Sequence, residues 1–179
     1  MAQTGRDIGV ARALLQRGEL VAVPTETVYG LAGNALHLPA ITKIFEVKDR
    51  PSFDPLIVHI ADFGQLEKYV AEIPRKAEEL ARHLWPGPLT LLLKKKSIIP
   101  DLVTSGLSTV AIRCPNHPLT HELLSSLEFP LAAPSANPFG YVSPTTALHV
   151  DEQLGAKIKY ILDGGPSTVG LESTIVGFG

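Results

Sequence analysis

Residues 20–27 read LVAVPTET, and this change from apolar to polar residues is the pattern from which the fold can be worked out. The apolar run Leu20 to Val23 predicts a short buried strand, which Pro24 ends. Three hydroxyl side chains and the carboxylate of Glu26 follow within residues 25–29. One interpretation is a polar turn with Glu26 exposed, and the other is a loop that faces a small polar ligand.

Strand and helix patterns alternate along the rest of the chain, without an internal repeat. Apolar runs predict further strands at residues 55–60, 89–93, 109–113, 131–133, 160–163 and 173–176. Helical spacing predicts helices at residues 8–16, 39–47, 74–84 and 118–127, and a last helix that Ser143 caps and that runs to Leu154. Strands mixed with helices indicate an α/β (α+β) domain with a partly parallel sheet, and such sheets bind ligands at their strand ends.

Length and composition are those of one folded domain. The chain has 179 residues, of which 45% are hydrophobic and 19% charged. No apolar run approaches the roughly 20 residues of a membrane span, so we expect a cytoplasmic protein without a membrane contact. Its single cysteine excludes an internal disulfide and a cysteine-based metal cluster. A net charge of −2 gives no general attraction to nucleic acid, so RNA would need a local basic patch such as Lys94–Lys96.

Two separate stretches predict an anion-binding site. Lys48-Asp49-Arg50-Pro51 ends a predicted helix and offers an ammonium group and a planar guanidinium, a combination that suits a polyphosphate. Pro134-Ser135-Ala136-Asn137-Pro138 holds hydroxyl, amide and backbone donors between two prolines. Each stretch by itself is also compatible with a solvated surface loop.

Two further polar residues end apolar strands. Alternation along residues 55–60 places Ile57 and His59 on one face of the strand, so that His59 is either a core histidine or a ligand contact. Arg113 closes the strand 109–113, where it either points to the rim or clamps a carboxylate. The sequence contains neither a P-loop nor a dinucleotide-binding glycine motif nor zinc-ligand spacing. Any metal would be Mg²⁺ carried by the phosphates of a nucleotide.

Six stretches in order resemble the YrdC-like family of L-threonylcarbamoyladenylate synthases. They are VPTETVYGLAGNA, KIFEVKDRPSFDPLIVHI, LWPGPLTLLL, VAIRCPNHP, PLAAPSANPFGYVSPT and ILDGGPSTVGLESTIV. The resemblance implies one YrdC-like domain over residues 1–179, with a twisted, mixed parallel and antiparallel sheet and flanking helices around a deep, positively lined cavity. It also implies a nucleotidyltransferase that makes L-threonylcarbamoyl-AMP and pyrophosphate from L-threonine, bicarbonate and ATP, with Mg²⁺ accompanying ATP.

The resemblance also implies a place in tRNA modification and a set of site residues. Partner proteins would transfer the threonylcarbamoyl group to the adenosine beside the anticodon of certain tRNAs. The implied L-threonine contacts are Thr27, His59, Arg113, Ala133 and Ser173. The implied ATP contacts are Lys48, Arg50, Asp54, Thr109, Ser135, Asn137 and Ser143, of which Lys48 and Arg50 are also the expected catalytic residues.

The chain departs from the family pattern at two places. Asp54 stands where members usually have Asn, and a carboxylate beside phosphates repels them unless Mg²⁺ or Lys48 offsets its charge. The chain stops at Gly179, whereas members continue with a strand that carries an Arg, so we expect the domain to be truncated at its C-terminus.

Two other functions fit parts of the sequence. A non-catalytic module that binds tRNA or double-stranded RNA would use the same cavity for a phosphodiester backbone, and its binding would depend steeply on salt. Carbamoyl-transfer proteins of hydrogenase maturation contain a similar domain, but they also carry acylphosphatase and zinc-finger segments that this chain lacks.

Overall fold

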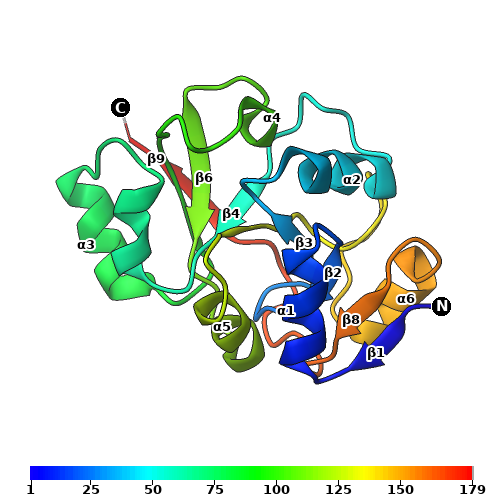
Figure 1. The fold of residues 1–179 in the computed structure, drawn as a ribbon. Helices are drawn as coiled ribbons and strands as arrows, with labels where there is room; N and C mark the ends of the chain where they lie inside the picture. The colour runs from blue at the N-terminus through cyan, green and yellow to red at the C-terminus, as the bar shows by residue number, and fades with distance from the viewer. Residues whose placement is uncertain (179) are drawn as a thin grey trace.

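A single mixed sheet of nine strands organises the computed structural model, which describes residues 1–178 (Figure 1). Gly179, the last residue of the predicted domain, lies outside the described residues. The strands are β1 (Gln3–Gly5), β2 (Val21–Val23), β3 (Gly30–Asn34), β4 (Ile57–His59), β5 (Leu89–Lys94), β6 (Thr109–Arg113), β7 (Leu131–Ala132), β8 (Tyr160–Leu162) and β9 (Thr174–Gly177). The helices are α1 (Ile8–Gln16), α2 (Leu38–Lys48), α3 (Arg75–Leu84), α4 (Asp101–Thr104), α5 (Pro118–Ser125) and α6 (Ala147–Leu154), with a 3-10 helix at Phe63–Lys68.

The strand order is β1-β8-β2-β3-β7-β4-β6-β5-β9. The pairs β1–β8, β2–β8, β4–β6 and β5–β9 are parallel, and the pairs β2–β3, β3–β7, β4–β7 and β5–β6 are antiparallel. The first and last strands of the chain therefore form the two edges of the sheet, and the termini lie at opposite ends of the molecule (Figure 1). This arrangement confirms the predicted mixed sheet with flanking helices.

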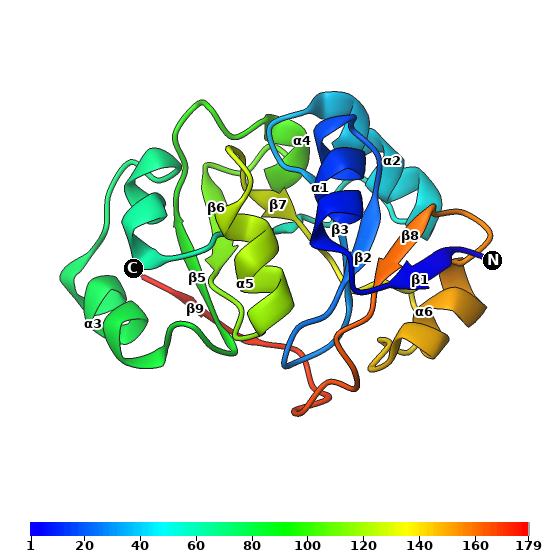
Figure 2. The same ribbon diagram turned by 60° about the horizontal axis from the view of Figure 1, so that its bottom comes forward.

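Side-chain alternation divides the strands between two faces. On one face, Val58 of β4, Leu91 of β5 and Ile112 of β6 join the larger hydrophobic core, to which α2, α3 and α6 add their apolar sides. The opposite face has a smaller core, in which Leu15 of α1 and Leu123 of α5 cover the half of the sheet formed by β8, β2, β3 and β7. Because α1 and α5 lie together over that half (Figure 2), the same face of β4, β6, β5 and β9 is left to line a cavity.

Most predicted elements are confirmed within one or two residues at their ends. The clearest omission is β3, for which the sequence pattern predicts no strand. Its residues, GLAGN, have little strand propensity of their own. Pairing with β2 on one side and β7 on the other holds this segment as a strand.

The predicted start of the last helix is wrong. Helix α6 begins at Ala147 and its N-cap is Thr146, whose hydroxyl accepts a hydrogen bond from the backbone N–H of His149. The segment before α6 lies alongside the residues that precede β3. The carbonyl of Pro144 in this segment accepts a hydrogen bond from the N–H of Tyr29 at 2.8 Å. Ser143 therefore lies outside the helix. Within residues 1–178, every helix falls short of the length and apolar character that a membrane span requires.

We predict that Leu91→Ala lowers the free energy of unfolding by about 2–5 kcal/mol, because the side chain is removed from the centre of the larger core. Leu91 is fully buried on β5, whereas Leu148 on α6 is 64% exposed. The matched control Leu148→Ala should change stability by less than about 0.5 kcal/mol. Urea denaturation of both variants measures the difference, and equal losses would contradict the assigned core.

Candidate functional site

The cavity has two joined compartments of different size. The outer compartment has a volume of about 410 Å³ and is lined by residues that include Arg50, Asp54, Thr109 and Glu172. The inner compartment is much smaller, about 30 Å³. Both are lined by Ile57, Pro134, Ser135 and Glu172, so the wall between β4 and the loop after β7 continues from one into the other.

The parallel pairing of β4 with β6 places two polar side chains side by side at the inner end. In this register His59 is opposite Arg113, and Ile57 is opposite Ala111. His59 and Arg113 both line the inner compartment, Ala111 lines the outer one, and Ile57 lines both. The predicted alternation along β4, with Ile57 and His59 on one face, is thus confirmed.

Arg113 is 3% exposed and is held on several sides. Its Nη1 donates to the hydroxyl of Thr27 at 2.8 Å, and its Nε donates to the carbonyl of Gly87 at 3.3 Å. Its Nη2 lies 2.7 Å from Oε1 of Glu26 in an ion pair. Nη1 therefore keeps one N–H for a ligand, and Nη2, whose contact with Glu26 is an ion pair without hydrogen-bond geometry, also remains able to donate to a ligand.

Glu26 is buried, so the interpretation of an exposed turn residue is wrong. Its residue exposure is 8%, and its second oxygen, Oε2, accepts a hydrogen bond from the N–H of Asn116 at 3.0 Å. The physical reason is that the loop after β2 folds against the end of β6, where the carboxylate meets a buried guanidinium. The alternative interpretation, a ligand-facing loop, applies to Thr25 and Thr27, which line the inner compartment.

The hydroxyl groups of Thr25 and Thr27 in this loop lie 2.9 Å apart. Thr25 donates its hydroxyl proton to the carbonyl of Val28 at 2.6 Å, and its oxygen accepts from the backbone N–H groups of Thr27 and Val28 at 3.2 Å. Thr27 in turn accepts from Arg113. Thr27 therefore keeps a second lone pair, which can accept a hydrogen bond from a ligand.

Burial and the nearby charge of Arg113 lower the pKa of His59 to about 3, so its imidazole is neutral. Its Nδ1 lies 3.3 Å from the carbonyl of Ile57, which makes Nδ1 the protonated nitrogen. The other ring nitrogen, Nε2, is then a hydrogen-bond acceptor. The inner compartment thus combines one buried guanidinium with two acceptors, from Thr27 and His59.

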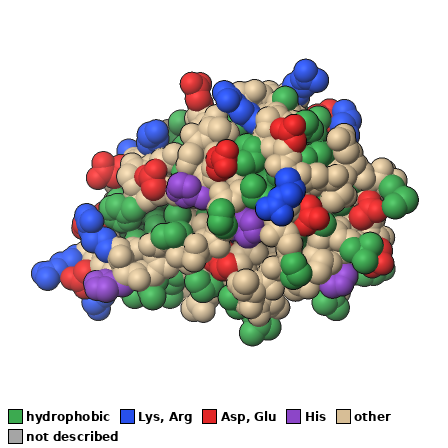
Figure 3. Space-filling view, turned by 90° about the horizontal axis from the view of Figure 1, so that it is seen from below, with side chains coloured by type: hydrophobic (Ala, Val, Ile, Leu, Met, Phe, Trp, Pro, Cys, Tyr) green, Lys and Arg blue, Asp and Glu red, His purple; other side chains and the backbone are tan. Residues whose placement is uncertain are grey.

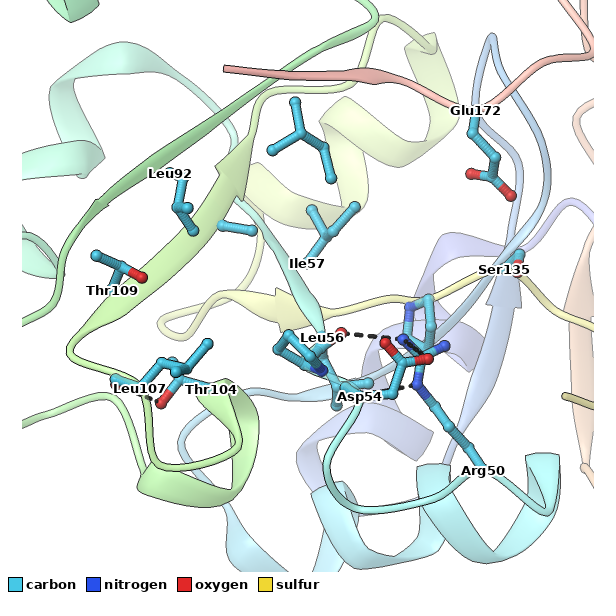
Figure 4. A pocket seen from close by; sticks show the side chains of 14 residues that line it. Arg50, Asp54, Leu56, Ile57, Leu92, Thr104, Leu107, Thr109, Ser135 and Glu172 are labelled. Carbon is cyan, nitrogen blue, oxygen red and sulfur yellow. Dashed lines mark hydrogen bonds and ion pairs between the residues drawn. The ribbon is translucent and has the colours of Figure 1, made fainter. Parts of the chain in front are cut away.

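The outer compartment carries charges of both signs (Figure 4). Nη2 of Arg50 forms an ion pair with Oδ2 of Asp54 at 2.9 Å, and Glu172 projects into the cavity from the segment before β9. The expected positive lining is therefore corrected, since the charged side chains that line this compartment are one arginine and two carboxylates. The group that offsets the charge of Asp54 is Arg50, rather than Lys48.

Lys48 connects the two predicted anion-binding stretches. Its ammonium group donates to the backbone carbonyls of Ser135 and Asn137, and the residue is 1% exposed. Burial, together with the neighbouring charge of Arg50, lowers the pKa of Lys48 to about 8. The lysine thus lies behind the wall that Ser135 forms, where it holds the loop in place.

Eight of the predicted site residues line the cavity: Thr27, His59, Arg113 and Ala133 in the inner compartment, Arg50, Asp54 and Thr109 in the outer one, and Ser135 in both. The other four, Lys48, Asn137, Ser143 and Ser173, support the wall.

Three of these supporting residues hold loops through their side chains. The amide of Asn137 donates to the carbonyls of Pro138 and Tyr141. Ser143 donates to Glu172 at 2.7 Å, and Ser173 shares a hydrogen bond of 2.7 Å with Thr90.

Sequence reasoning did not assign a role to Glu26 or Glu172. The signal for each was present, because both carboxylates stand next to hydroxyl residues at the end or start of an apolar strand. What the sequence does not reveal is which residue each carboxylate contacts. Arg113 is 87 positions from Glu26, and Ser143 is 29 positions from Glu172.

Comparison with known proteins assigns the chain to a family. The sequence profile of the Sua5/YciO/YrdC family, described as "Telomere recombination", matches residues 13–178. A Pyrococcus abyssi protein named threonylcarbamoyl-AMP synthase is 52% identical over 169 residues, which cover 94% of this chain and 50% of the relative. A Bacillus subtilis protein of the same name is 52% identical over 170 residues, which cover 94% of this chain and 49% of the relative.

A solved structure agrees with the fold along nearly the whole chain. The crystal structure of P. abyssi Sua5 complexed with L-threonine superposes with a TM-score of 0.95 at 48% identity, and covers 99% of this chain and 54% of that one. The chain thus spans about half the length of the relatives that it matches.

We predict that Lys48→Met changes the pH dependence of stability. Lys48 has a lower pKa in the folded protein than the usual 10.5, so folding carries the cost of burying its charge below about pH 8 and escapes it as the amine deprotonates. The free energy of unfolding of the unmodified protein minus that of the variant should rise by roughly 1–3 kcal/mol between about pH 8 and 10.5. Urea denaturation at a series of pH values measures this difference, and a flat difference would contradict the assigned burial.

Proposed function

Because the chain belongs to the Sua5/YciO/YrdC family, we propose that it forms L-threonylcarbamoyl-AMP and pyrophosphate from L-threonine, bicarbonate and ATP. The single observation that carries this proposal is the two-compartment cavity. A small inner compartment with a buried arginine opens into a larger one with room for a nucleotide. The relatives named threonylcarbamoyl-AMP synthase support the same activity.

L-Threonine fits the hydrogen-bonding groups of the inner compartment. Its carboxylate would accept from the free N–H groups of Arg113, and its hydroxyl and amino groups are donors. Thr27 and Nε2 of His59 offer lone pairs to these two donors. A ligand with two donors beside a carboxylate therefore has a partner for Arg113, Thr27 and His59, as a buried polar site requires.

The reaction needs positioning and charge stabilisation more than a nucleophilic side chain. The amino nitrogen of threonine attacks the carbon of bicarbonate, water leaves, and the resulting carbamate oxygen attacks the α-phosphorus of ATP as pyrophosphate departs. The lowered pKa of His59 makes its imidazole a weak base, so the threonine ammonium would lose its proton to solvent. Arg50 would stabilise negative charge on the phosphates, and Lys48 would hold the Ser135 loop against them.

Mg²⁺ fits this site as a companion of ATP. Within the part of the chain that the structure describes, no group of three or more His, Cys, Asp or Glu side chains is arranged to hold a metal ion. The outer compartment nevertheless contains the carboxylates of Asp54 and Glu172, which are oxygen donors of the type that Mg²⁺ accepts. The cation would supply positive charge to the phosphates, which would provide most of its ligands.

An RNA-binding module without catalysis is not favoured. Acidic and basic side chains are interspersed on the face shown in Figure 3. The basic run Lys94–Lys96 is also engaged within the protein, since Lys95 forms an ion pair with Asp101 at 2.5 Å and Lys94 lies 3.5 Å from Glu72. Delivery of the product to tRNA, its transfer proteins and a location in the cytoplasm stay predictions.

We predict that the protein binds L-threonine and that Arg113→Ala weakens this binding by about 10- to 150-fold, because a charge-assisted hydrogen bond contributes roughly 1.5–3 kcal/mol. Isothermal titration calorimetry with L-threonine, L-serine and L-allo-threonine measures affinity and selectivity. Arg75→Ala, at an exposed arginine on α3, is the matched control and should bind threonine normally.

Absence of threonine binding by the unmodified protein would overturn the proposed function. Salt-dependent binding of tRNA that is indifferent to threonine would then support the RNA-binding module. ATP binding at saturating threonine and bicarbonate would extend the result to the outer compartment.

We predict that Glu172→Gln strengthens the binding of ATP without Mg²⁺ by about threefold to tenfold, because one carboxylate no longer repels the phosphates. With Mg²⁺ present the gain should be smaller, since the cation already offsets that charge. Titration of ATP with and without Mg²⁺ measures both effects. Glu152→Gln, at an exposed residue of α6, is the matched control.

Weaker ATP binding by Glu172→Gln would contradict this prediction. If Glu172→Gln weakens ATP binding only when Mg²⁺ is present, Glu172 is a ligand of the metal ion and the repulsion argument is wrong.

A further inference from the structure

The proposed reaction gives Arg113 a role but does not explain why Glu26 is buried in an ion pair with it. Glu26 lies behind Arg113 and outside the residues that line the inner compartment, at 8% exposure. Its Oε1 is 2.7 Å from Nη2 of Arg113 and its Oε2 accepts from the backbone N–H of Asn116. The carboxylate is therefore held by the hydrogen bond from Asn116 and lies in an ion pair against the guanidinium.

This pair also determines the net charge next to the ligand. Arg113 contributes one positive charge and Glu26 one negative charge, while the lowered pKa of His59 leaves that ring neutral. The charges of Arg113 and Glu26 thus cancel at the inner end of the cavity before a ligand enters. Glu172 adds a negative charge at the junction with the outer compartment, where it is exposed to solvent and hydrogen-bonded to Ser143.

A balanced site discriminates between ligands by their own net charge. A simple carboxylate would leave one uncompensated negative charge in a buried region, which is costly. A zwitterion brings a carboxylate and an ammonium group together and leaves the balance unchanged. Without Glu26, the lone guanidinium would instead favour the simple anion.

We propose that Glu26 is a positioning residue that acts through Arg113 and makes the inner compartment select a zwitterionic amino acid over a hydroxy acid anion. The inference rests on the proposed function, because it takes L-threonine as the ligand of this compartment. It adds a role for a residue that touches no substrate. Its two effects are to orient the guanidinium and to cancel its charge.

The test compares two ligands that differ only in the amino group. (R)-3-Hydroxybutyrate is L-threonine with the amino group replaced by hydrogen, so it keeps the carboxylate, the hydroxyl and the methyl group. Calorimetry gives the ratio of the two dissociation constants for each protein. The unmodified protein should prefer L-threonine, and Glu26→Gln should reduce this preference by about tenfold or more, as expected for one charge acting over a few ångströms in a partly buried site.

Two further variants separate charge from structure. Glu26→Asp keeps the negative charge and should keep most of the preference for L-threonine, even if both affinities fall. Glu152→Gln removes an exposed carboxylate elsewhere and should leave the ratio unchanged. A role confined to stability would lower both affinities together, so the ratio reports on the proposed role alone.

Each outcome decides between the claims. If the unmodified protein binds neither ligand, the proposed function fails. If it binds L-threonine but Glu26→Gln retains the full preference, the function stands and this inference is overturned. If Glu26→Gln does not fold, the unmodified protein and Glu26→Asp decide the matter. Equal affinity for the two ligands in these two proteins would overturn the inference. A preference for L-threonine in both proteins would support it.

Discussion

The alternation of side chains along β4, β5, β6 and β9 is the constraint on which the rest of the structure depends. One face of these strands supplies the larger core, so its residues must be apolar and closely packed. The other face is covered by helices only over its remaining half, and there its residues line a cavity. A shift of one residue in the register of any of these strands would exchange the two sets of side chains. The site therefore depends on the same pairing that builds the core.

The buried pair of Glu26 and Arg113 is better understood as a feature of the site than as a source of stability. Removing two charges from water costs several kcal/mol per ion, and their attraction roughly compensates when the geometry is good. An apolar pair of similar volume would serve the fold as well. What an apolar pair would lack is a guanidinium held in one orientation, with two N–H groups free and with its charge already cancelled. That combination suits a ligand that carries both charges itself.

Lys48 shows how one residue can connect a local motif to the rest of the site. The helix α2 ends at Lys48, and Asp49 then adopts a left-handed backbone conformation that turns the chain toward Arg50. The lysine reaches the carbonyls of Ser135 and Asn137, while Arg50 reaches the carbonyls of Asp54 and Pro55 and the carboxylate of Asp54. Both cations thus organise the loops around the cavity. The loop that carries Ser135 is thus held from behind by Lys48.

The sequence by itself determined the local elements and pointed to several of the polar residues that line the cavity. Apolar runs ended by proline or by a polar residue were sufficient to predict β2, β4, β6 and β7, because strand alternation and proline act within a few residues. Polar groups in otherwise apolar positions pointed to Thr27, His59 and Arg113 for the same reason. Only the tertiary structure decided β3, the burial of Glu26, the placement of Lys48 behind the wall and the balance of charge in the cavity. Each of these depends on a partner that is distant in the sequence, and neither propensity nor spacing contains the pairing free energy that brings such partners together.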